Sequence, residues 1–321
     1  MPDYIFKTYI DSGREYYEYT DAADREQTIK KDFPFPESLM ELLYMDTQEL
    51  EAITRKIDKA LLAFYQSGAK DDLQVVAAGL DELASRHVYF ELLRLDWTER
   101  LKAVERVTPK EYLRLLPHKK ISHIYSNIDT MQRQIISLIT HALDMDGEKK
   151  SVSEKMVAYY NAEGNDTLYT FQFQPQPVNF EVIDRRIFAE VLYPKDIYDL
   201  IDHHIRECVK REVRMRVCKN CLRYFAVTGK ASTEYCDRIC DSKGRTCREI
   251  GAINTWTQRK QGDEVFKEYR REYKKRFARI NAGKLTKSVF YAWSEEARKK
   301  KEDCDNGTIT PEDFSRWLKE S

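Results

Sequence analysis

Apolar side chains recur at spacings of three and four residues through much of the first half of the chain. This helical period extends from Glu37 to about Asp146, and its clearest run ends at Gly68. That run contains Leu50, Ile53, Ile57, Ala60, Leu61 and Phe64. Further helices are predicted near residues 72–95, 108–116 and 119–145. The pattern therefore predicts a helical bundle.

After this bundle, apolar side chains recur at every second residue. Residues 167–173 alternate between apolar and polar side chains, which predicts a strand. A helix is predicted over residues 196–210, where apolar residues share one face. Val213, Met215 and Val217 then alternate with arginines and predict a short strand that leads into Cys218.

Three more helices are predicted near the end of the chain. The first, residues 264–281, combines an aromatic stripe with many lysines and arginines. The second begins at Thr286 or Ser288. The third has Thr310 as N-cap residue and Pro311 at its first position, a common start for a helix.

The charges of the 321 residues sum to zero but are unevenly distributed. Residues 206–301 contain 27 Lys and Arg against 12 Asp and Glu, whereas residues 1–205 contain 25 against 36. A basic segment of this size suggests a surface for nucleic acid, or a basic region that docks on an acidic one. Apolar runs typical of a signal peptide or a membrane span are absent, so we expect a cytoplasmic protein.

Five of the seven cysteines are clustered, in the spacing Cys218-x2-Cys221-x14-Cys236-x3-Cys240-x6-Cys247. The cysteines are clustered, their total is odd and the sequence shows no export signal. These features favour a bound metal over disulfides. A Cys-x2-Cys pair followed by further cysteines is typical of a structural Zn²⁺ site with four thiolates. These residues leave the fourth ligand open. Cys240 lies one helical turn after Cys236, and Cys247 lies at the start of a helix, where N–H groups stabilise a thiolate.

The stretch Cys218-Lys-Asn-Cys221-Leu-Arg-Tyr-Phe225, with Tyr235-Cys236-Asp237-Arg238 and Thr246-Cys247-Arg248, resembles a family of uncharacterised proteins from Gram-positive bacteria. The similarity covers roughly residues 196–321. The resemblance implies Cys218, Cys221, Cys236 and Cys247 as ligands, with Cys240 as a spare thiol. Leu222 departs from the glycine expected there, which loosens the turn without removing a ligand. More distantly, the layout resembles the zinc module of predicted bacterial transcription regulators. No activity is established for the family, so the resemblance implies none.

Catalytic motifs are not evident in the sequence. Four cysteines would close a zinc site, and the sequence lacks the motifs of zinc proteases and zinc deaminases. His203 and His204 are more simply interpreted as packed side chains than as ligands. We therefore expect a protein that is not an enzyme and has no small-molecule substrate.

The basic helix over residues 264–281 is the second candidate site. Its proposed nucleic-acid-binding residues are Arg270, Arg271, Lys274, Lys275 and Arg279, with a tyrosine or Trp256 stacking on bases. The alternative is an ordinary amphipathic helix whose aromatic stripe is core and whose basic face is solvated. Two hypotheses follow. One is a zinc-stabilised, regulatory protein that binds DNA or RNA. The other is a protein-interaction module whose basic segment docks on an acidic partner or on its own acidic domain.

The expected architecture has four parts. They are an N-terminal arm or short hairpin over residues 1–36, an acidic helical domain over 37–164, a β-containing connector over 165–195 and a zinc module with basic helices over 196–321. The first boundary is set by the two X-Pro bonds in Phe33-Pro34-Phe35-Pro36, which favour extended backbone. The fold class is expected to be mainly α with a small β-containing zinc module (α+β). In it, an N-terminal helical bundle precedes a treble-clef or ribbon-like zinc site followed by helices.

Overall fold

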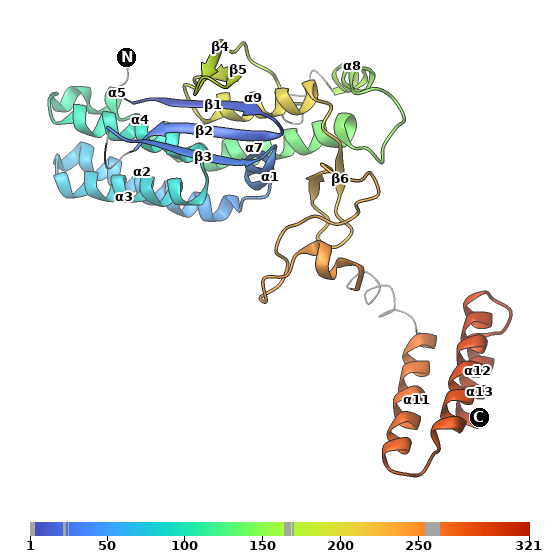
Figure 1. Ribbon diagram of the computed structural model, residues 1–321. Coiled ribbons are helices and arrows are strands. Elements are labelled where there is room, and N and C mark those ends of the chain that lie inside the picture. Colours follow the sequence, from blue (N-terminus) through green and yellow to red (C-terminus); the bar gives the residue numbers. More distant parts are fainter. Residues whose placement is uncertain (1–3, 22–23, 25, 164–167, 169, 254–263) are drawn as a thin grey trace. The chain divides into compact units, whose positions relative to one another are not determined.

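The computed structural model describes residues 4–21, 24, 26–163, 168, 170–253 and 264–321 (Figure 1). The chain divides into two compact units. The N-terminal unit comprises Met1–Val217 and Arg223–Thr233, and the C-terminal unit comprises Cys218–Leu222 and Glu234–Ser321. Across the part of the chain that is described, no helix has the length and apolar character needed to cross a membrane.

A five-stranded antiparallel sheet with strand order β3-β2-β1-β5-β4 lies in the N-terminal unit (Figure 1). Its strands are β1 (Phe6–Asp11), β2 (Arg14–Thr20), β3 (Thr28–Pro34), β4 (Val178–Ile183) and β5 (Ile187–Leu192). Ser12 and Gly13 connect β1 to β2 with φ angles of 47° and 76°. Positive φ at both central residues is what a two-residue hairpin turn requires.

This sheet joins two segments that the sequence analysis treated as separate parts. Residues 1–36 were expected to form an arm or a short hairpin, and they supply three strands. The connector expected over residues 165–195 supplies the other two, because Tyr9 of β1 lies opposite Val191 of β5. The structure therefore differs from the four-part scheme: arm and connector form one sheet.

Most of the N-terminal unit is helical. Its helices are α1 (Glu37–Leu43), α2 (Thr47–Ser67), α3 (Lys70–Arg86), α4 (Tyr89–Val104), α5 (Tyr112–Leu115), α6 (His118–Ser122), α7 (Ile124–Leu138), α8 (Val152–Glu163) and α9 (Ile197–Lys210). A 3₁₀ turn, η1 (Pro109–Glu111), precedes α5, and a π-helical turn, η2 (Ile139–Leu143), continues α7. Gly68 ends α2 with a left-handed φ of 69°, as predicted.

Two local predictions were wrong in this unit. The helix predicted over residues 72–95 is two helices, because His87 adopts extended backbone while its ring contacts the carbonyl oxygen of Ser38. The strand predicted over 167–173 lies partly outside the described residues, and its described residues 168 and 170–173 form none. Phe171 is instead buried against the helices, and its carbonyl oxygen accepts a hydrogen bond from Tyr160.

One continuous apolar cluster connects the sheet to the helices. Phe6, Tyr17 and Tyr19 point from β1 and β2 into this cluster, whereas Tyr9 lies on the opposite face in a smaller cluster with Val191. Gly79 allows α3 to approach α2 closely, because a Cβ atom there would lie 2.4 Å from Cγ1 of Ile57. The core that the helical periodicity predicted is thus present, and the sheet covers it.

The segment around the cysteines begins in a two-stranded ribbon, β6 (Met215–Val217) and β7 (Tyr224–Ala226), which pair antiparallel. The last helices are α11 (Glu264–Asn281), α12 (Lys287–Asp305) and α13 (Pro311–Glu320). These three pack around Phe290, Trp293 and Phe314. Thr286 caps α12 and Thr310 caps α13, each by accepting a backbone N–H with its side chain.

Candidate metal centre

A tight turn positions Cys218 and Cys221 at the end of β6. The N–H of Leu222 donates to the carbonyl oxygen of Cys218 at 2.9 Å. Leu222 has a left-handed φ of 58°, and its side chain is 77% exposed. Because this conformation strains side chains with a Cβ atom, it explains why glycine is expected at this position.

A helical segment that starts at Cys247 positions the fourth cysteine. Residues 247–253 are helical as far as the structure describes them. Thr246 caps this segment with Glu249: the Thr246 side chain accepts the N–H of Glu249 at 3.3 Å, and the Glu249 carboxylate accepts the N–H of Thr246 at 2.6 Å. This reciprocal capping box fixes Cys247 in the first helical turn. Gly251 lets the segment pack on Tyr235, because a Cβ atom there would lie 2.3 Å from the ring.

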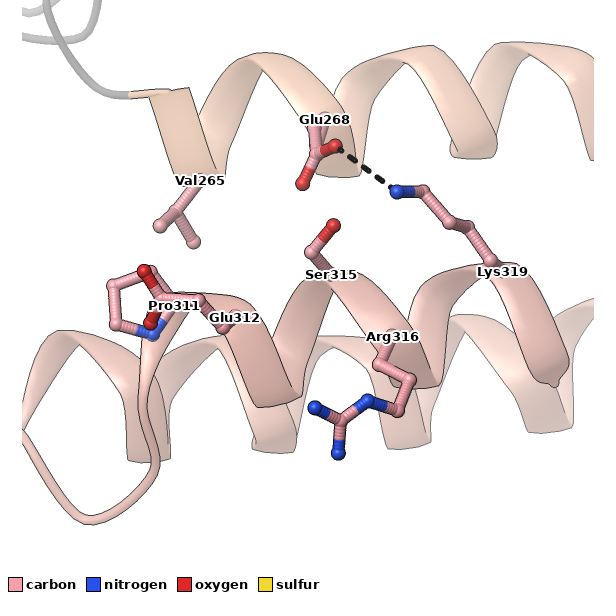
Figure 2. A pocket seen from close by; sticks show the side chains of 7 residues that line it. All are labelled: Val265, Glu268, Pro311, Glu312, Ser315, Arg316 and Lys319. Atoms are coloured by element: carbon pink, nitrogen blue, oxygen red, sulfur yellow. Dashed lines mark ion pairs between the residues drawn. The ribbon is translucent and has the colours of Figure 1, made fainter.

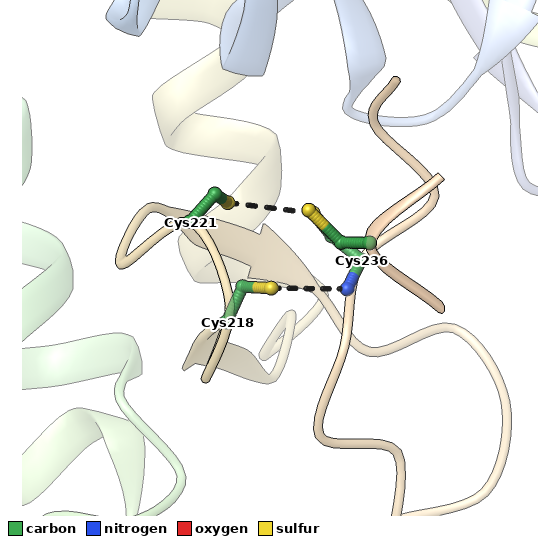
Figure 3. Close-up of side chains that lie close together, drawn as sticks. Cys218, Cys221 and Cys236 are labelled. Carbon is green, nitrogen blue, oxygen red and sulfur yellow. Dashed lines mark hydrogen bonds between the residues drawn. The ribbon is translucent and has the colours of Figure 1, made fainter. Parts of the chain in front are cut away.

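The thiols of Cys218, Cys221, Cys236 and Cys247 come together at one point. Their four sulfur atoms all lie within 4.8 Å of one another. Figure 3 shows three of these cysteines, of which Cys221 and Cys236 have their sulfur atoms 3.7 Å apart. Four thiolates at about 2.3 Å around a tetrahedral Zn²⁺ would be about 3.8 Å apart. The sulfur cluster is therefore of the size that holds a metal ion.

Cys240 does not belong to this cluster. Its thiol donates to the carbonyl oxygen of Arg245 at 3.4 Å, and its backbone N–H donates to the same oxygen at 2.9 Å. Those bonds form part of a turn in which the Asp241 carboxylate accepts the N–H groups of Lys243 and Arg245. Of the two alternatives for the fourth position, the structure thus gathers Cys247 with the other three cysteines.

Hydrogen-bond donors surround the sulfur atoms. The N–H of Cys236 lies 3.4 Å from the sulfur of Cys218, and Nδ2 of Asn220 donates to the sulfur of Cys247 at 3.2 Å. Burial opposes ionisation of Cys218, but the N–H groups of Cys221, Cys236 and Asn220 outweigh it and lower the pKa of Cys218 to about 7. Burial, together with the nearby thiolate of Cys218, raises the pKa of Cys236 to about 11. Burial, together with the neighbouring Cys236, raises the pKa of Cys247 further.

These pKa values describe three thiols that cannot all ionise side by side without a cation. A bound cation would compensate the negative charges and keep all four deprotonated. Cys218, Cys236 and Cys247 are almost completely buried. Four sulfur atoms of which three are shielded in this way could hold a metal ion.

The five basic residues predicted for nucleic-acid binding lie on α11, and all five are exposed. Arg270 and Lys274 are one helical turn apart, and Lys275 also forms an ion pair with Glu272 at 3.1 Å. Trp256 lies outside the described residues. Tyr269 and Tyr273 pack against the bundle core, so this part of the aromatic stripe is core, as the alternative interpretation expected.

Helix α13 covers another side of α11. Figure 2 shows Val265 and Glu268 of α11 facing Pro311 and Ser315 of α13, and Glu268 forms an ion pair with Lys319 at 3.9 Å. Arg276 is also engaged within the bundle, since its guanidinium lies 4.5 Å from the centre of the Trp293 ring. The exposed cations of α11 are therefore on the sides of this helix that the bundle leaves uncovered.

A buried polar cluster in the N-terminal unit escaped the sequence analysis. It combines Glu15, Tyr17, Ser38, Tyr89 and His204, each at most 1% exposed. The hydroxyl of Tyr17 lies 2.7 Å from that of Ser38 and 2.8 Å from Nε2 of His204. The Ser38 hydroxyl is also 3.1 Å from the Tyr89 hydroxyl, and the backbone N–H of Ser38 donates to the Glu15 carboxylate. These side chains come from β2, α1, α4 and α9, so no local sequence motif unites them.

The ring of His204 has a neighbour on each side. Its Nδ1 lies 2.8 Å from the carbonyl oxygen of Leu200, which can only accept, so Nδ1 carries a hydrogen. Its Nε2 lies 3.2 Å from a carboxylate oxygen of Glu15. Because the cluster is closed to solvent, it specifies packing in this conformation and offers no surface to a substrate.

His203 is buried on α9 in a different way. Neither of its ring nitrogens has a hydrogen-bond partner in the described part of the chain. Burial, with a contribution from His204, lowers its pKa to about 3. Both histidines are thus packed side chains, as expected.

Comparison with known proteins adds a family match. Residues 167–320 match a family of unknown function (DUF6076). No curated protein and no solved structure matches the chain. The match includes the whole cysteine segment and begins earlier than residue 196, so it also covers β4 and β5, of which β5 pairs with β1.

Proposed function

We propose that this chain is a zinc-stabilised protein that binds DNA or RNA and does not act as an enzyme. The metal is Zn²⁺ in a structural role, held by Cys218, Cys221, Cys236 and Cys247. The basic face of α11 contacts the phosphates. We place this activity in the cytoplasm, in a regulatory role.

The sulfur cluster is the single observation that carries the zinc assignment. Four cysteine thiols within 4.8 Å of one another match the preference of Zn²⁺ for tetrahedral sulfur sites. Two of them come from a turn between paired strands and one from the first turn of a helical segment, which supports a treble-clef-like arrangement.

The exposed cations of α11 support nucleic acid as the partner. Arg270, Arg271, Lys274 and Arg279 are exposed and form no ion pair in the described part of the chain. Exposed lysines and arginines along a helix neutralise phosphates and release counterions. Phe277 and Tyr291 are 48% and 64% exposed and supply the aromatic surfaces that Trp256 and the packed tyrosines were expected to offer.

A salt titration with a charge-matched control tests this function. Binding of labelled DNA and RNA is measured for the metal-loaded protein, for Arg270→Gln/Arg271→Gln/Lys274→Gln and for Lys56→Gln/Lys59→Gln/Lys110→Gln. The control removes the same charge from exposed positions of the N-terminal unit. We expect the first variant to weaken binding and to reduce the slope of log K against log salt by about 3. Equal effects of the two variants would contradict a specific role for α11.

The alternative function is a protein-interaction module. The observation that favours it is charge complementarity, since residues 1–205 contain 36 acidic against 25 basic residues. In that case the protein would bind one metal ion but no nucleic acid, and the α11 variant would instead lose an acidic protein partner.

A further inference from the structure

The N-terminal unit contains a cavity of about 430 Å³ whose lining lysines contrast with the acidic character of residues 1–205. It is lined by residues of α4, α6 and α7 and by the first residues of α9. Its volume is within the range of small-molecule sites, which is about 300–1,000 Å³. All its lining residues belong to one compact unit.

The floor of this cavity is apolar. Leu92 and Trp97 of α4, Ile124 of α7 and Ile197 of α9 contribute to its lining, and each is at most 4% exposed to solvent. Such a floor suits a ring or another apolar part of a ligand.

The rim of the cavity is cationic. Lys119 and Lys120 of α6 and Lys195, just before α9, line it and are exposed. None of these lysines forms an ion pair with any residue that the structure describes. Residues 1–205 carry an excess of acidic residues, so a rim with three unpaired ammonium groups is a local departure from the charge of its surroundings.

The two carboxylates in the lining are already engaged. Asp96 forms an ion pair with Arg100 at 2.8 Å, and Asp196 caps α9 by accepting the N–H groups of Tyr198 and Asp199 at 2.9 and 3.2 Å. Arg100 also donates to the carbonyl oxygen of Leu115 at 3.0 Å, so its guanidinium is held in place at the cavity. The lysines are left as the groups that attract an anion.

We propose that this cavity binds a small organic phosphate. Its phosphate lies on Lys119, Lys120 and Lys195, and its ring or apolar part lies against Leu92, Trp97 and Ile124. This site uses neither the sulfur cluster nor α11, so it stands independently of the proposed function. It adds a small-molecule ligand to a protein for which the sequence indicated no small-molecule substrate.

Pyridoxal 5′-phosphate tests the site directly, because it combines a ring, a phosphate and an aldehyde that forms an imine with a nearby lysine. The full-length protein is treated with this reagent and then with borohydride, and labelled lysines are mapped by mass spectrometry. We expect Lys119, Lys120 or Lys195 to react about tenfold faster than the exposed Lys56 and Lys59, since a cationic cleft concentrates anions. Pyridoxal, which lacks the phosphate, is expected to show no such preference.

Two competitors and one variant complete the test. Excess ATP, an organic phosphate, is expected to protect the rim lysines, whereas adenosine is not. Lys119→Gln/Lys120→Gln is expected to abolish selective labelling at Lys195 as well, while Lys56→Gln/Lys59→Gln leaves it unchanged. Uniform labelling of exposed lysines, or equal selectivity with pyridoxal, would overturn the proposal. Protection by duplex DNA but not by ATP would also overturn it, because the lysines would then belong to a nucleic-acid surface.

Discussion

The N-terminal unit and the cysteine segment (residues 218–222 and 234–253) bury different kinds of side chain. The N-terminal unit has a continuous apolar cluster that includes side chains from β1, β2 and most of its helices. In the cysteine segment, the buried residues are Cys218, Cys236, Cys247, Ile250 and Gly251. A single buried aliphatic side chain cannot offset the entropy of ordering such a segment, so under the proposed function a metal ion on the thiols supplies the missing stability.

The largest expected effect is unfolding of the cysteine segment while the N-terminal unit stays folded. Cys236→Ser removes one of the four clustered thiols and should unfold the cysteine segment, because structural Zn²⁺ supplies roughly 10–16 kcal/mol to small zinc folds. Hydrogen exchange read by mass spectrometry should show loss of protection over residues 218–222 and 234–253, with the N-terminal unit unchanged. Cys240→Ser is the matched control and should retain wild-type protection. Wild-type protection in Cys236→Ser would show that the segment folds without a metal.

A substitution in the apolar core should weaken only the N-terminal unit. Ile57→Ala on α2 removes a fully buried side chain and should cost about 2–5 kcal/mol of unfolding free energy. Urea unfolding measures this loss, and Leu62→Ala on the same helix is the control, since Leu62 is 42% exposed. The metal content of the folded protein should stay the same. A loss of metal in Ile57→Ala would mean that the two regions do not depend on separate sources of stability.

A smaller effect should appear as a pH dependence of the N-terminal unit. His203 has a folded-state pKa of about 3 against an ordinary value of 6.5, so the unfolded chain binds a proton there before the folded protein does. This difference makes stability fall by about 1.4 kcal/mol per pH unit as the pH drops below 6.5 towards 3. His203→Phe should flatten that dependence by one proton, as followed by urea unfolding at several pH values. An equally steep pH dependence in His203→Phe and in the wild type would contradict the assignment of a buried neutral ring to His203.

The smallest effect concerns the turn between Cys218 and Cys221. Leu222→Gly should stabilise the cysteine segment by about 1 kcal/mol, because glycine adopts the left-handed conformation without strain. Competition with a chelator measures the gain as slower metal loss. Leu222→Ala keeps the Cβ atom and should give no such gain, so equal behaviour of the two variants would exclude relief of backbone strain.

Local patterns predicted those parts of the fold that local forces determine. Gly68 as a helix end and Thr310 as an N-cap were confirmed, since capping depends on a few neighbouring residues. The spacing of the cysteines likewise located the sulfur cluster. Two further local signals were present but unused: Ser12-Gly13 as a hairpin turn, and Thr246 with Glu249 as a capping box.

Features that depend on distant pairing could not be predicted in this way. Tyr9 meets Val191 across the sheet, and Tyr17 meets His204 in the buried polar cluster. Such pairs depend on the packing of the whole unit. The periodicity of a single sequence does not indicate which distant residues will meet. The cationic rim escaped detection for the same reason, because Lys119 and Lys195 belong to separate elements.

Native mass spectrometry of the purified protein tests the central claim, that four specific cysteines hold one structural metal ion. Wild type and Cys240→Ser should each carry one Zn²⁺ per chain, and Cys247→Ser should carry none. A wild-type protein without metal, or a Cys247→Ser variant that retains zinc while Cys240→Ser loses it, would contradict the account.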